Sequence, residues 1–142
     1  MFPDEERIKR LNRLLNDEPC QPNALSPISL AFLGDAVYET MVREHLARQT
    51  EQKPEELHRA AVRYVSAQAQ SEAMRRILPL LTEEETQAFK RGRNAHVTHV
   101  PKGATTAQYH SATGFEALFG WLYLNGSIER LRELFAVIRR GE

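Results

Sequence analysis

Two carboxylates lie in apolar stretches that are far apart in the chain. Asp35 is the one acid in SLAFLGDAVY, residues 29–38, and Glu116 is the one charged residue in SATGFEALFGWLYL, residues 111–124. An isolated carboxylate in apolar surroundings is strongly disfavoured, so each acid needs a proton, a basic partner or a cation. The pattern therefore predicts two acids in the protein interior, each with a compensating partner.

Small residues near both acids would let their helices approach closely. They are Ala31 and Gly34 near Asp35, and Ala112 and Gly120 near Glu116. If the two helices pack side by side, the carboxylates face each other, and they repel unless they share a proton or a divalent ion. Oxygen ligands suit Mg²⁺, with Mn²⁺ as a substitute. Glu39, one helical turn after Asp35, is a candidate for supporting the same site.

A structural interpretation of the same acids stays open at this point. Each carboxylate could be an ordinary buried partner of Arg43, Arg63, His58 or a helix-end amide, which is the commoner fate of buried acids. Glu39 could equally be a solvated surface acid.

A locally basic segment precedes Glu116 in a chain with no net charge. Residues 87–114 contain no acid, and their polar and basic side chains Lys90, Arg91, Arg93, Asn94 and Lys102 are candidates for holding phosphate oxygens of a nucleic acid. The alternative is a solvated helix end, where the helix dipole favours Lys and Arg.

The histidines of this region do not have zinc-site spacing. His96, His99 and His110 are separated by three and eleven residues, which argues against a histidine metal site. His110, about one and a half turns before Glu116, is a candidate for positioning substrate, and its neighbour Tyr109 is a candidate for supporting the site.

The elements that must position these residues are all expected to be helices. Apolar positions recur at helical spacing and alternating strand-like runs are absent, so the sequence predicts an all-α bundle of about seven helices. The expected helices are a short first one marked by Ile8, Leu11, Leu14 and Leu15; a second from Ser26 to about Arg48; a third from about Pro54; a fourth over about 67–80; a fifth capped by Thr82 and ended near Gly92; a sixth over 106–125; and a seventh capped by Ser127. Residues 96–105 are expected to form a loop.

Composition limits the class of protein. The 142 residues are 42% hydrophobic, with 19 basic and 19 acidic side chains, which fits one compact domain over 1–142 with an N-terminal extension at 1–22. Cys20 has no second cysteine to pair with, and no apolar run is long enough to span a bilayer. We therefore expect a soluble cytoplasmic protein that is not associated with a membrane.

Two motifs resemble the ribonuclease III catalytic domain. FLGDAVYE, followed about eighty residues later by FEALFGWLYL, is similar to the signature motifs of that family, and the match is closest to its short form, Mini-ribonuclease III, which has no double-stranded-RNA-binding domain. LAFLGDAVYE, KRGRNA, the PK of the loop and the 109–120 stretch follow the family's order and spacing. The resemblance covers residues 30–124.

The resemblance implies a homodimeric, Mg²⁺-dependent endoribonuclease that cuts double-stranded RNA to leave 5′-phosphate and 3′-hydroxyl ends. It assigns Asp35 and Glu116 as metal ligands and catalytic residues. Two acids of the full-length enzymes are replaced here by Ala31 and Thr113, which places Thr113 among the supporting candidates. In the short form the implied substrate is precursor 23S ribosomal RNA, with a ribosomal protein as a candidate for presenting it.

Other interpretations predict different experimental outcomes. In a catalytically silent RNA-binding or ribosome-associated module, Asp35 and Glu116 would be structural. In a helical scaffold that binds no nucleic acid, charge reversal across residues 90–93 would alter only solubility. Candidates for a dimer contact are Phe32, Leu33, Phe119 and Trp121, each of which could instead belong to the core.

Overall fold

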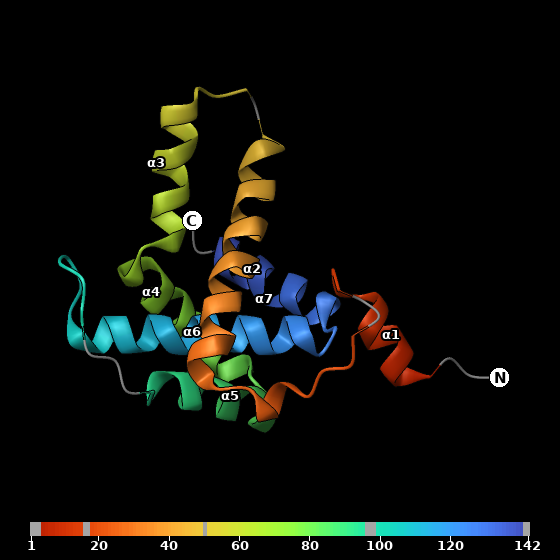
Figure 1. Ribbon diagram of the computed structural model, residues 1–142. Coiled ribbons are helices and arrows are strands. Elements are labelled where there is room, and N and C mark those ends of the chain that lie inside the picture. The colour runs from red at the N-terminus through yellow and green to blue at the C-terminus, as the bar shows by residue number, and fades with distance from the viewer. Residues whose placement is uncertain (1–3, 16–17, 50, 96–98, 141–142) are drawn as a thin grey trace.

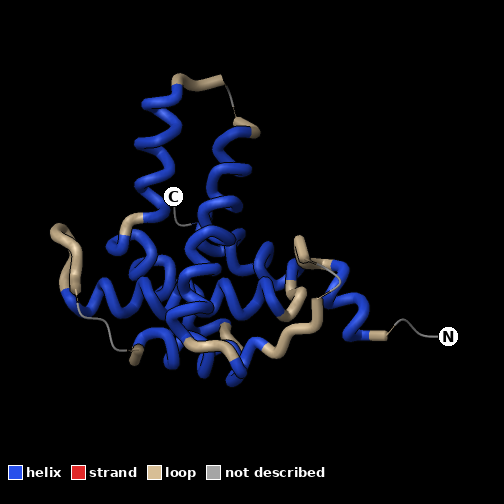
Figure 2. The backbone as a smooth tube through the Cα atoms, in the orientation of Figure 1, coloured by secondary structure: helices blue, strands red, loops and turns tan. Residues whose placement is uncertain are grey.

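The computed structural model describes residues 4–15, 18–49, 51–95 and 99–140, and these form an all-helical fold. The α-helices are α1 (Glu5–Leu11), α2 (Pro27–Ala47), α3 (Pro54–Val65), α4 (Ala67–Ile77), α5 (Glu83–Arg93), α6 (Thr106–Leu124) and α7 (Ile128–Arg140). Short 3-10 turns, η1 (Pro22–Ala24) and η2 (Leu78–Leu80), join some of them, and no strand occurs in these ranges (Figure 2). The predicted fold class and the number of helices are confirmed.

Helix α6 forms the centre of the molecule (Figure 1). Ten of its nineteen residues are buried, and α2, α4, α5 and α7 all pack against it. A cluster of aromatic rings fills the crossing of α2 and α6, where the Tyr38 ring lies 4.8 Å from Phe115 and 5.2 Å from Phe119 in edge-on contacts. The sequence of this helix is apolar on every face, as expected for a helix that other helices cover on several sides.

Local capping signals explain where the helices begin. The Ser26 hydroxyl accepts a hydrogen bond from the Ser29 amide, and Pro27 occupies the first position of α2. Capping boxes start α5 at Thr82 and α6 at Thr105. These interactions involve residues within one turn of each other, which is why the sequence alone predicts the caps at Ser26 and Thr82.

Two predicted helix ends are wrong. The fourth helix was expected to reach Leu80, but α4 stops at Ile77 and a 3-10 turn containing Pro79 follows, since proline cannot donate the next helical hydrogen bond. Gly92 was expected to help end the fifth helix. It lies inside α5 and brings this helix close to α6, because an added Cβ would lie only 2.9 Å from the Gly114 Cα.

The N-terminal segment differs from the expected amphipathic helix. Helix α1 ends at Leu11 and buries none of its residues, and Leu14 and Leu15 are exposed. The segment is nevertheless attached to the end of α6, because the Leu14 backbone amide donates to the Tyr123 hydroxyl oxygen at 2.6 Å and the Asn12 side chain donates to the Gly126 carbonyl at 2.8 Å. No helix of the described ranges has the length and apolar composition needed to cross a bilayer.

Candidate active site

Asp35 and Glu116 meet at one cavity. It has a volume of about 340 Å³ and lies where α2, α6 and the start of α4 converge with the loop before α6. Besides the two acids, it is lined by residues 65–68 and Gln70 around the start of α4, by Pro101, Lys102, Gly103 and Ala104 of the loop, and by Tyr109 and Ala112 of α6. Two carboxylates separated by eighty residues of sequence therefore share one opening.

Two glycines bring the helices of the acids into close contact. A Cβ on Gly34 would overlap the carbonyl oxygen of Glu116, and a Cβ on Gly120 would overlap the carbonyl oxygen of Leu30. The backbones of α2 and α6 thus touch directly at this crossing, which Figure 1 shows at the centre of the molecule. Asp35 follows Gly34 in the chain, so this contact brings its carboxylate beside Glu116.

The two carboxyl groups are electrostatically coupled. Burial raises the pKa of Glu116 to about 8, and the charge of Asp35 and a hydrogen bond with it act in the same direction. A hydrogen bond with the Gln70 amide acts in the opposite direction. At neutral pH and without a cation, Glu116 therefore retains a proton that a divalent ion would replace.

The prediction that Asp35 lies in the interior is wrong. Its side chain is exposed, as are Phe32 and Ala36 on the same helix, whereas Leu30, Gly34 and Tyr38 are buried. Helix α2 is apolar on both sides, but in this chain only one side is covered by other helices. Glu116 is half-buried and supplies the less solvated member of the pair.

Neither acid forms an ion pair within the described ranges. Arg43, one of the bases considered as a partner, binds Glu39 at 2.8 Å instead. Glu39 does not line the cavity of the two acids. No cluster of three or more histidine, cysteine, aspartate or glutamate side chains that could hold a metal occurs in the described part of the chain. Any cation site built from these residues would therefore rest on two carboxylates.

Gln70 is a cavity residue that the sequence analysis missed. It is only 2% exposed and lies in the first turn of α4. Its position matches the buried stripe of Ala73, Met74 and Ile77 at helical spacing. A polar residue on a predicted apolar stripe was the signal that could have identified it.

The predicted RNA-binding residues separate into two groups. Lys102 is exposed and lines the cavity of the acids. The other four lie at the end of α5 and do not line it. There, the Arg91 guanidinium donates to the Leu25 carbonyl at 3.0 Å, Arg93 stacks over the Phe89 ring and binds Asn94, and Lys90 is exposed.

The remaining candidates near Glu116 also separate. Tyr109 lines the cavity, whereas the buried Thr113 hydroxyl donates to the Tyr109 carbonyl at 3.0 Å and does not face it. The ring of His110 lies 6.5 Å from that of Tyr109, His99 is exposed, and His96 lies outside the described residues.

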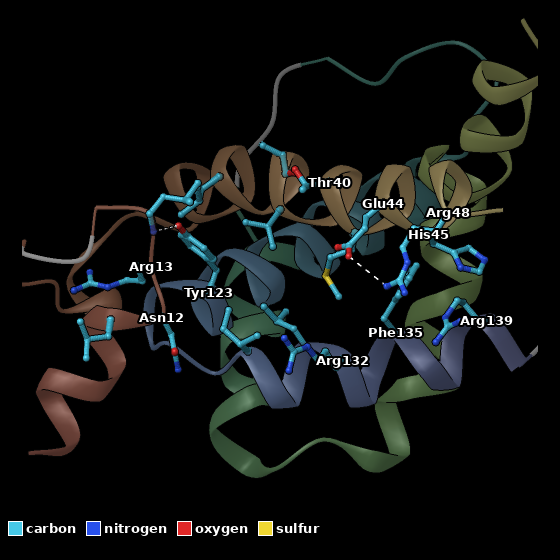
Figure 3. A pocket seen from close by; sticks show the side chains of 18 of the residues that line it. Asn12, Arg13, Thr40, Glu44, His45, Arg48, Tyr123, Arg132, Phe135 and Arg139 are labelled. Atoms are coloured by element: carbon cyan, nitrogen blue, oxygen red, sulfur yellow. Dashed lines mark hydrogen bonds and ion pairs between the residues drawn. The ribbon is translucent and has the colours of Figure 1, made fainter. Parts of the chain in front are cut away.

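A second, larger groove lies between α2, α7 and the segment after α1 (Figure 3). Its volume is about 1060 Å³, and it includes neither Asp35 nor Glu116. Leu33, Ala36 and Val37 of α2 form one wall, and Leu131 and Phe135 of α7 lie opposite. This larger groove is therefore separate from the coupled acids.

Comparison with known proteins identifies the family. The model of the ribonuclease III domain matches residues 28–127, which include both acids and the cavity. Two Mini-ribonuclease 3 proteins are similar over most of their length. The protein of Symbiobacterium thermophilum is 46% identical, and the match covers 85% of this chain and 96% of the relative. The protein of Brevibacillus brevis is 48% identical, and the match covers 82% of this chain and 90% of the relative. The chain belongs to the Mini-ribonuclease 3 group of the ribonuclease III family.

A solved structure supports the same assignment at the level of the fold. A crystal structure of a Fusobacterium nucleatum protein matches with a TM-score of 0.78 and 30% identity, over 83% of this chain and 94% of that one. As a member of the Mini-ribonuclease 3 group, this chain is an endoribonuclease, and its substrate is RNA.

Proposed function

We propose that this Mini-ribonuclease 3 cleaves double-stranded RNA with the help of a divalent cation held by Asp35 and Glu116. The observation that carries the proposal is the meeting of these two carboxylates at one cavity, with the pKa of Glu116 raised to about 8. The donors fit the group, because carboxylate oxygens are the ligands that Mg²⁺ and Mn²⁺ prefer and the adjoining cavity has room for water.

The residues that line the cavity would have two separate roles, cation binding and phosphate binding. Asp35 and Glu116 would hold the cation, and a bound cation supplies charge stabilisation at the phosphate and activation of water. Lys102, in the loop that lines the same cavity, would hold a phosphate oxygen of the strand that is cut. Such contacts with the phosphates of the RNA backbone recognise the shape of an A-form duplex rather than its sequence. The expected products carry 5′-phosphate and 3′-hydroxyl ends.

Substitution of the two acids tests this proposal. We expect Asp35→Asn and Glu116→Gln each to lower the rate of Mg²⁺-dependent cleavage by about a thousandfold, which corresponds to a loss of ~4 kcal/mol of transition-state stabilisation. Circular dichroism and RNA binding should stay near those of wild type. Glu39→Gln is the matched control, because Glu39 lies one turn away and binds Arg43 rather than the cavity.

Unchanged cleavage by Asp35→Asn would contradict the proposed site. If the wild-type chain binds duplex RNA but does not cleave it at any Mg²⁺ or Mn²⁺ concentration, the alternative of a silent RNA-binding module is favoured. Sequencing of both fragment ends distinguishes 5′-phosphate products from those of a metal-independent ribonuclease.

A homodimer is part of the same proposal. Phe32 is 85% exposed on the uncovered face of α2, beside the wall of the larger groove that Leu33, Ala36 and Val37 form. A large exposed aromatic next to an apolar groove is typical of an interaction surface. The chain has no net charge, so two copies do not repel each other strongly. Two copies related by a twofold axis would present two sites to opposite RNA strands.

The resemblance to the short ribonuclease III form supports a finer substrate, precursor 23S ribosomal RNA. A chain with no net charge is expected to bind RNA weakly and with strong dependence on salt, so a ribosomal protein is a reasonable presenter. Cleavage of a protein-free precursor at the same bonds would make such a helper unnecessary.

A further inference from the structure

Gln70 is a buried polar side chain at the cavity of the two acids. It is 2% exposed, and its neighbours on the same stripe of α4 are Ala73, Met74 and Ile77, all buried and apolar. Burying a side-chain amide is unfavourable unless its polar groups are hydrogen-bonded. A polar residue at this position therefore calls for a specific partner.

The partner is Glu116. Both side chains line the same cavity, and the Gln70 side-chain amide forms a hydrogen bond with the Glu116 carboxyl group. The amide N–H groups of Gln70 are the donors available to a carboxylate oxygen. Asp35 lines this cavity as well and also forms a hydrogen bond with Glu116. Glu116 thus contacts one side chain of α2 and one of α4.

The backbone around Gln70 is well anchored. Ser66 follows α3 and caps the start of α4. Its hydroxyl accepts a hydrogen bond from the backbone amide of Ala69 at 3.2 Å, and its carbonyl accepts one from the backbone amide of Gln70 at 2.9 Å. Helix α4 then packs along α6. Asp35, by contrast, is exposed. The more buried side of the acid pair is therefore the one that Gln70 contacts.

We infer that Gln70 is a positioning residue that orients the Glu116 carboxylate toward Asp35 for binding of the divalent cation. This inference rests on the proposed cation site. Gln70 is not itself assigned as a ligand. Partners that orient a metal ligand typically change metal affinity by about 10- to 100-fold when they are removed. The inference therefore concerns the affinity for the cation and leaves RNA binding unaffected.

Direct metal binding tests the inference without relying on activity. Gln70→Met removes the donor and keeps an unbranched side chain of similar size, and Gln87→Leu, at an exposed position of α5, is the matched control. Electron paramagnetic resonance titration of the metal-free chains with Mn²⁺ gives the dissociation constant. We expect it to rise about 10- to 100-fold for Gln70→Met and to stay unchanged for the control.

Kinetics separate positioning from a general structural role. For Gln70→Met, the Mg²⁺ concentration at half-maximal rate should rise by the same factor, excess Mg²⁺ should restore most of the rate, and the KM for duplex RNA should stay unchanged. A loss of rate that excess Mg²⁺ does not restore, with wild-type Mn²⁺ affinity, would overturn the inference.

A measurement on the wild-type chain covers the case in which the variant does not fold. The side-chain ¹⁵N resonance of Gln70 should shift when Mg²⁺ is added to the wild-type protein and should not shift in Asp35→Asn. If the wild-type protein binds Mg²⁺ and this resonance does not shift, the inference is contradicted. If wild type binds no Mn²⁺ or Mg²⁺ at all, the proposed cation site itself fails, which is a distinguishable result.

Discussion

At the scale of single residues, the site depends on two acids in unequal surroundings. Asp35 is exposed and Glu116 is half-buried, and both line one cavity together with Gln70. Burial, and after it the neighbouring charge of Asp35, raises the pKa of Glu116. A divalent cation would remove the repulsion and allow both groups to be ionised.

This arrangement predicts how stability depends on pH in the metal-free protein. The pKa of Glu116 is raised from its ordinary value of 4.5 to about 8, so the folded chain binds one more proton than the unfolded chain between these values. The free energy of unfolding should therefore fall as pH rises from 5 to 8, by at most about 1.4 kcal/mol per unit. Thermal denaturation in EDTA across this range measures the effect.

Two controls identify the group that is responsible. Glu116→Gln should remove this part of the pH dependence and should raise the melting temperature of the metal-free protein at pH 8. Glu39→Gln should keep the wild-type slope. A metal-free wild-type chain that becomes more stable between pH 5 and 8, with Glu116→Gln behaving identically, would contradict the assignment of the coupled pair.

At the scale of elements, the site is produced by the crossing of α2 and α6 and by the loop before α6, which lines the same cavity. The crossing is close because Gly34 and Gly120 place no side chain between the helices. The loop contributes Lys102, while the basic end of α5 does not line the cavity. Each of these features has a measurable consequence.

Gly34→Ala should destabilise the protein strongly. The new Cβ would overlap the Glu116 carbonyl oxygen, and backbone of a central helix cannot move aside cheaply. We expect a loss of about 3 kcal/mol in the free energy of unfolding, at the upper end of the usual cost of overpacking, measured by urea denaturation. Gly103→Ala is the comparison, because open space surrounds its Cβ and only its φ of +92° is unfavourable, at a cost of about 1 kcal/mol. Equal midpoints for the two variants would contradict this account of the crossing.

Lys102→Ala should weaken RNA binding more than substitution of a lysine outside the cavity. Removing one phosphate contact is expected to raise the dissociation constant several-fold and to lower the slope of its salt dependence by about one. Filter binding of duplex RNA in Ca²⁺ between 50 and 200 mM salt measures both quantities. Lys53→Ala, at the exposed start of α3, is the matched control and should leave both unchanged.

At the scale of the whole molecule, the distribution of apolar surface separates core residues from interaction residues. Phe119 and Trp121 were candidates for a dimer contact, but both are buried, and the Trp121 indole donates to Asn23 at 2.8 Å. Phe32 remains exposed on α2, next to the larger groove. An apolar face of this kind is costly to leave in water, which supports a second copy as its partner.

Phe32→Ser should shift the protein from dimer to monomer. Loss of a central exposed aromatic is expected to weaken association by at least about thirtyfold, which corresponds to ~2 kcal/mol. Light scattering coupled to size exclusion over a dilution series measures this shift. Leu80→Ser, which replaces another exposed apolar residue on η2, should leave the mass unchanged. A wild-type chain that is monomeric at all concentrations would contradict the dimer proposal.

Much of the fold was predictable because its signals are local. Caps at Ser26, Thr82 and Thr105 and apolar residues at helical spacing specify where helices begin and which residues share a face. The two unusual acids, and the expectation that they meet, also came from the sequence, since a charge in an apolar stretch requires a partner wherever the chain folds.

Only the tertiary structure decided which faces are covered and which residues surround the acids. Periodicity places Phe32, Asp35 and Gly34 on their helix, but the packing of other helices determines that the first two are exposed and the third is buried. The same is true of Gln70, whose partner comes from a different helix. Contacts between distant segments depend on crossing angles and close approaches, and a single sequence specifies these only through the complete packed core.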